Sequence, residues 1–122
     1  MRSFFTPLAA AIALAAAPLQ AQLAPAPQLT AVQQTSLKCA IALSVGSELQ
    51  KRGDPAAAGW PPLEARAREF FVQVMAQLMD DTGMSHDQVA ALVREQAKGL
   101  ADKPTLTRAM PGCIALMGES GV

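Results

Sequence analysis

Apolar side chains recur at intervals of three and four residues through the middle of this chain, and that spacing predicts an amphipathic helix over residues 61–83. Its apolar face carries the two adjacent bulky side chains Phe70 and Phe71, together with Leu63, Ala67, Val74 and Leu78. Because so wide an apolar face is unstable in water, neighbouring segments must cover it. We therefore expect the rest of the chain to be organised around this helix.

Two further segments have a helical pattern. Residues 33–52 predict a first helix that ends at Gly53, and residues 86–100 predict a third. The third helix begins with a capping box, in which Ser85 is followed three residues later by Gln88. The short connection through Gly83 predicts an antiparallel pair formed by the second and third helices.

The C-terminal part of the chain is interrupted by prolines. Pro104 marks the end of the third helical pattern, and residues 105–110 are compatible with either a turn or a helical stub. A short final helix is expected to begin at Pro111 and to carry Cys113. No segment shows the alternation and turns of a β-hairpin. The pattern therefore predicts an all-α domain over residues 33–118, a small bundle of three main helices plus a short C-terminal helix, with residues 119–122 frayed.

The first residues have the features of a cleaved signal peptide, which we place at residues 1–21. A positive start, Met1-Arg2, precedes an uncharged apolar run, and Leu19-Gln20-Ala21 offers a small residue at the cleavage point. The alternative is an uncleaved membrane anchor, but the run is broken by Pro18 and is shorter than the ~20 residues that span a bilayer. We expect a periplasmic or secreted protein with no integral membrane segment after leader removal, and a flexible Pro/Ala/Gln-rich lead-in over residues 22–32.

Export changes the interpretation of the two cysteines, Cys39 and Cys113. An even number of cysteines in an oxidising compartment favours a disulfide over two free thiols. The sequence therefore predicts one disulfide that staples the first helix to the last.

Composition and charge exclude several classes of function. The chain is 51% hydrophobic, and its ten basic and ten acidic residues show no basic block, so no nucleic-acid partner is expected. His86 is the single histidine, and no nucleophile motif accompanies it. We therefore expect no catalytic residues and no cofactor, and we keep a small enzyme only as a second alternative.

A group of soft donors gives the first alternative function. Met75, Met79, Met84 and His86 lie within a short span, and thioether sulfurs with an imidazole select Cu(I). The competing interpretation is that Met75 and Met79 fill the core of an aromatic-poor domain.

The main prediction is a binding module that acts through protein–protein or small-ligand contacts, with an apolar groove beside the second helix. Candidate surface residues are Trp60, Phe70 and Phe71. Trp60 has an alternative role, since it could cover the ends of the first two helices. The partner is an unidentified protein or client, and a homodimer is compatible with the same apolar surface.

Overall fold

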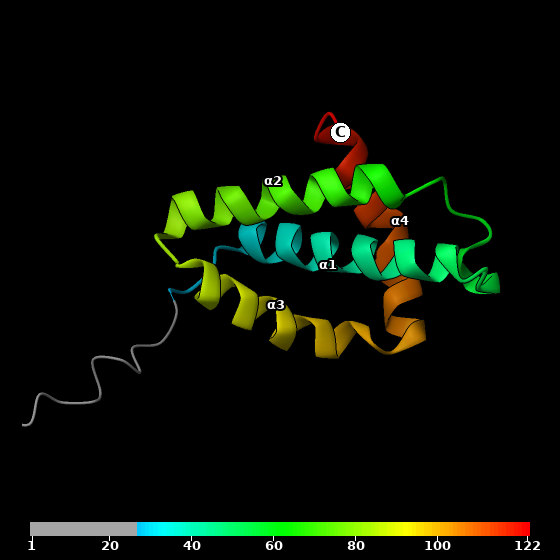
Figure 1. Cartoon of the computed structure of the whole chain (residues 1–122), viewed down its shortest axis with the longest axis horizontal. Coiled ribbons are helices and arrows are strands. Elements are labelled where there is room, and N and C mark those ends of the chain that lie inside the picture. The colour runs from blue at the N-terminus through cyan, green and yellow to red at the C-terminus, as the bar shows by residue number, and fades with distance from the viewer. Residues whose placement is uncertain (1–26) are drawn as a thin grey trace, which may run out of the picture.

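A computed structural model describes residues 27–122, which form four α-helices and no strand (Figure 1). The helices are α1 (Ala31–Lys51), α2 (Glu64–Thr82), α3 (His86–Leu100) and α4 (Lys103–Glu119), and a short 3-10 helix, η2 (Pro55–Ala57), lies between α1 and α2. The all-α prediction is confirmed for this range. The predicted signal peptide and the start of the lead-in lie outside the described residues.

Local side-chain caps set the start of α1. Thr30 Oγ1 accepts a hydrogen bond from the backbone N–H of Gln33 at 3.1 Å, and Gln33 Oε1 accepts one from the N–H of Thr30 at 2.9 Å. This capping box satisfies two backbone donors that a helix N-terminus leaves without partners. As a result α1 begins two positions before the predicted boundary, inside the stretch expected to be a flexible lead-in.

The connector between α1 and α2 is held by one side chain of α1. Gln50 accepts a hydrogen bond from the N–H of Leu63 at 3.0 Å and donates to the carbonyl oxygens of Trp60 and Pro61 at 3.2 and 2.8 Å. These bonds hold residues 60–63 as an irregular segment. The helix expected over residues 61–83 therefore begins only at Glu64.

The predicted antiparallel pair of α2 and α3 is confirmed. Gly83 ends α2 in the left-handed conformation, with φ of 70°, which favours glycine. The Ser85–Gln88 capping box then begins α3 at His86, the predicted residue. Figure 1 shows α2 and α3 running in opposite directions from this turn.

The prediction of a short C-terminal helix that begins at Pro111 is wrong. α4 spans 17 residues, because Asp102 caps its first turn by accepting from the N–H of Thr105 at 3.0 Å. Pro104 lies in that first turn, where a backbone N–H is not needed, and Pro111 lies inside the helix on its exposed side. Both prolines are thus accommodated within one continuous helix.

The central element is α1, and not the helix of residues 61–83 that the sequence favoured. α1 packs against α2, α3 and α4, and Figure 1 shows it between α2 and α3 with α4 crossing it. Five consecutive side chains, Cys39 to Leu43, are buried. Ser47, a polar residue, is also buried. Small side chains such as Ala40, Ala42 and Gly46 allow neighbouring helices to approach α1 closely.

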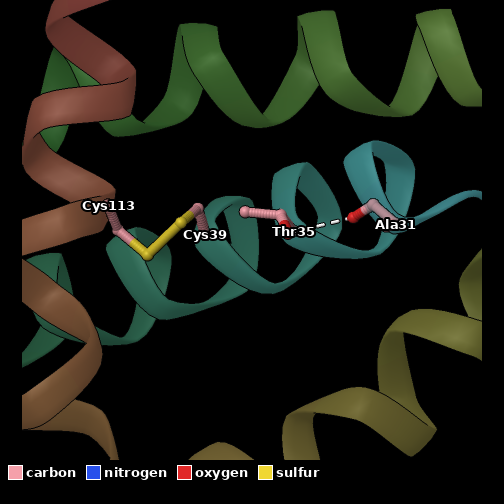
Figure 2. Close-up of a disulfide and its surroundings, with 4 residues drawn as sticks. All are labelled: Ala31, Thr35, Cys39 and Cys113. Carbon is pink, nitrogen blue, oxygen red and sulfur yellow. Dashed lines mark hydrogen bonds between the residues drawn. A yellow bond between two sulfur atoms is a disulfide. The ribbon is translucent and has the colours of Figure 1, made fainter.

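A disulfide joins α1 to α4, as predicted. Cys39 and Cys113 are both buried, and their Cα atoms lie 4.9 Å apart (Figure 2). One turn earlier on α1, the Thr35 hydroxyl donates to the carbonyl oxygen of Ala31 at 2.9 Å (Figure 2). The bridge spans 74 positions and so fixes the last helix to the central one.

None of the helices within residues 27–122 is both long enough and apolar enough to cross a lipid bilayer.

Candidate binding site between α2 and α3

Part of the surface of α2 and of α3 is not covered by α1 or by the other helices. Both helices pack chiefly on α1 and contact one another at few positions. In Figure 1, α1 separates them along most of their length. Side chains from residues 71–79 of α2 and residues 86–94 of α3, on either side of the turn that joins the two helices, together line a surface hollow of about 290 Å³, which we call the α2–α3 hollow.

The lining of the α2–α3 hollow follows from helical spacing. On α2 it consists of three side chains four residues apart, Phe71, Met75 and Met79. On α3 two similar rows contribute the remaining residues: His86, Val89, Ala90, Val93 and Arg94. Residues four apart lie on one face of a helix, so each helix presents a continuous strip to the other. The hollow is therefore apolar, with an imidazole and a guanidinium as its polar groups.

The two adjacent phenylalanines have different environments. Phe70 is buried in the core, with 4% of its surface exposed, whereas Phe71 is half-buried and lines the α2–α3 hollow. Trp60 is not part of this lining. It is half-buried against the core, and its ring lies close to Gly46 of α1. Of the three candidate surface residues, Phe71 is thus the one that the hollow contains.

The methionines also divide into two groups. Met84, Met110 and Met117 are buried, with no more than 4% of their surface exposed. Met75 and Met79 are half-buried and line the α2–α3 hollow together with the exposed His86. The structure therefore brings together three of the four predicted soft donors, and Met84 lies outside the lining.

Four other hollows have larger volumes, and two of them carry more polar groups. One, of about 380 Å³ between α1 and α2, combines the polar side chains of Gln33, Gln73, Gln77 and Asp81 with the apolar side chains of Val32, Phe70, Val74 and Leu78. Another, of about 640 Å³, lies beside residues 27–38 and includes Gln34, Lys38 and Gln96. The amide and charged groups in these two linings are well solvated, so these groups provide little driving force for binding an apolar side chain.

The charged contacts with shifted pKa values lie away from the α2–α3 hollow. Lys103 Nζ lies 2.7 Å from Asp54 Oδ2, and this bond, with the N–H of Ala56, lowers the pKa of the Asp54 carboxyl. Hydrogen bonds from the Thr105 hydroxyl and N–H lower the pKa of Asp102 in the same way. Bonds to Glu64 and Glu48 raise the pKa of Lys51. These groups join helix ends and have a structural role.

Within residues 27–122 no group of three or more histidine, cysteine, aspartate or glutamate side chains is placed to hold a metal ion.

Comparison of the chain with protein-family models, with curated proteins and with solved structures finds no match. The function is accordingly inferred from the residues of the site.

Proposed function

We propose that this protein is an exported binding protein whose α2–α3 hollow takes up apolar side chains of a partner protein. The observation that carries the proposal is the hollow itself. Three large apolar side chains in its lining, Phe71, Met75 and Met79, are only half-buried and so remain partly exposed to water. Leaving such side chains partly in water costs hydrophobic free energy, and a partner that covers them recovers it.

The shape of the hollow, which is open to solvent, favours a protein segment over an enclosed small molecule. Sites for drug-sized ligands enclose about 300–1,000 Å³ and cover most of the ligand surface. The α2–α3 hollow is open and, at about 290 Å³, has room for a few side chains. An amphipathic helix laid between two helices inserts such a row of side chains, and flexible methionines adapt to different ones.

Export is supported by the leader-like sequence of residues 1–21 and by the disulfide. A buried Cys39–Cys113 bridge is of the kind that persists in oxidising compartments. The partner is therefore sought among envelope or extracellular proteins.

The test uses two neighbouring alanines of α3. Ala90 lines the α2–α3 hollow, whereas Ala91 is exposed outside it. Ala90→Arg places a long charged side chain in the hollow, and Ala91→Arg adds the same charge to the same helix without blocking it. Tagged wild-type and variant proteins are used to capture partners from the envelope fraction of cells that make the protein.

We expect wild type and Ala91→Arg to capture the same partner and Ala90→Arg to lose it, with matching circular dichroism spectra for all three. Equal capture by Ala90→Arg contradicts the proposal, and so does the absence of any partner specific to the wild type.

A further inference from the structure

The α2–α3 hollow brings together the accessible soft donor atoms of the described chain. Met75 and Met79 are one helical turn apart on α2, and His86 faces them from the first turn of α3. The other methionines of residues 27–122 are buried elsewhere. Three potential ligands from two helices therefore converge on one small surface site.

The chemistry of these donors selects the ion. Two thioethers are soft donors that select a soft monovalent ion such as Cu(I), and an imidazole is also a copper ligand. Hard divalent ions such as Mg²⁺ and Ca²⁺ require carboxylate or carbonyl oxygens, and no carboxylate lines the hollow. Zn²⁺ sites use histidine, cysteine and acidic side chains, and no group of three or more of these comes together within residues 27–122.

The disulfide removes the strongest competing ligands. Thiolates bind Cu(I) more tightly than thioethers, but the two cysteines of the chain are joined to each other. Any Cu(I) affinity of the oxidised protein must therefore come from methionine and histidine.

The flexibility of methionine allows the site to close on an ion smaller than the hollow. Its side chain has three rotatable bonds, so both sulfurs can reorient within the hollow. The half-buried position of Met75 and Met79 leaves the room for this rotation.

We propose that Met75, Met79 and His86 form a Cu(I)-binding site in the α2–α3 hollow. The site goes beyond the proposed function and does not depend on it. Because the two would share residues, bound Cu(I) and a partner's side chains exclude each other, and this one consequence does rest on the proposed function.

The experiment is an anaerobic titration of the mature, disulfide-bonded protein with Cu(I), in competition with a chromophoric chelator. The variants are Met75→Leu/Met79→Leu and His86→Ala, which remove donors while keeping the hollow apolar. Met84→Leu is the matched control, because it removes a neighbouring thioether that lies outside the lining. Methionine methyl signals are followed by NMR with Ag(I), a redox-inert substitute for Cu(I), and Zn²⁺ serves as the control metal.

We expect one Cu(I) per chain, unchanged affinity in Met84→Leu, and a loss of at least about tenfold in both ligand variants, since even second-shell changes cost this much at metal sites. Ag(I) is expected to shift the methyl signals of Met75 and Met79 and leave those of the three buried methionines unchanged. Failure to withhold Cu(I) from the chelator overturns the site, as does equal affinity in Met75→Leu/Met79→Leu, equal binding of Zn²⁺, or Ag(I) shifts at other methionines. Partner capture by the double leucine variant, which keeps the hollow apolar, tests the proposed function separately.

Discussion

Gly46 is the residue at which the packing of α1 is tightest. A Cβ atom added there would lie 2.7 Å from Met110 Cε, 3.2 Å from Met110 Sδ and 3.3 Å from Trp60 Cζ3. Met110 is fully buried, so its side chain has little space in which to move. The missing side chain of Gly46 thus lets α4 and the α1–α2 connector contact the central helix.

A pair of glycine substitutions tests this packing. Gly46→Ala is expected to lower the free energy of unfolding by about 1 kcal/mol. Overpacking destabilises the fold by about 1–3 kcal/mol, and the higher helix propensity of alanine offsets at most about 1 kcal/mol of that loss. Gly112→Ala is the matched control, since it lies within α4 with nothing within 4 Å of its added Cβ. It is expected to stabilise the fold by about 0.5–1 kcal/mol. Urea denaturation measures both, and stabilisation by both changes would contradict the close approach at Gly46.

For single residues, the sequence identifies which side chains could bind a metal better than it identifies which of them are buried. The spacing of Met75 and Met79 and the nearness of His86 along the chain suffice to suggest one site. The burial of Met84 depends on how the turn between α2 and α3 folds back, which no periodicity encodes. Ala90, Val93 and Arg94 were missed as site residues because a helical pattern identifies a face without identifying the helix opposite it.

The sequence of α4 contains features that favour a helix and two prolines that argue against one. Its buried residues Leu106, Met110, Cys113 and Met117 are spaced by four, three and four positions, which is a helical stripe already visible in the sequence. The two prolines argue against a continuous helix here, although Asp102, which precedes both of them, caps the first turn by accepting from the N–H of Thr105. A proline in the first turn or on an exposed side is compatible with a helix when tertiary packing stabilises it.

Two aspartates at the start of α4 and of η2 give a pH dependence with a defined sign. The pKa of Asp54 is lowered by its bond to Lys103, and that of Asp102 by its bonds to Thr105. A carboxyl with a lower pKa in the folded state stabilises the fold at pH values above its unfolded pKa, near 3.8, and loses this effect as pH falls through the folded pKa. Acidification should therefore weaken the attachment of α4.

The double variant Asp54→Asn/Asp102→Asn isolates this effect, because asparagine keeps a side-chain oxygen that can accept the capping bonds but does not titrate. We expect its free energy of unfolding to fall less than that of wild type between neutral pH and about pH 3. Urea denaturation at both pH values measures the difference. The same decrease in both proteins would show that these carboxyls do not carry the acid sensitivity.

At the level of the whole molecule, the central helix is α1, whereas the sequence pattern favours α2. The sequence draws attention to α2 because it holds both adjacent phenylalanines, whereas α1 consists largely of small residues. A helix packed on three sides buries most of its circumference, so its pattern shows no single apolar face. The helical class and the disulfide could be predicted from periodicity and cysteine count, but the arrangement around α1 arises from contacts distant in sequence.

Removal of the bridge between α1 and α4 should destabilise the whole molecule. Cys39→Ala/Cys113→Ala releases a loop of 74 positions. The loop-entropy model gives a loss of about 4 kcal/mol, within the range of about 2–5 kcal/mol for native bridges in small domains. Thermal and urea denaturation of the variant and of the reduced wild type measure the loss. Unchanged stability in both would mean that the bridge contributes nothing to holding α4 on α1.

The proposed binding depends on the α2–α3 hollow being open to solvent. Methionine oxidation tests this in a single sample. Brief treatment of the folded protein with hydrogen peroxide, followed by peptide mass spectrometry, gives an oxidation rate for each methionine. We expect rapid oxidation of Met75 and Met79 and slow oxidation of the three buried methionines, Met84, Met110 and Met117. Met75 and Met79 as slow as the buried three would contradict it, because the hollow would then be closed to solvent.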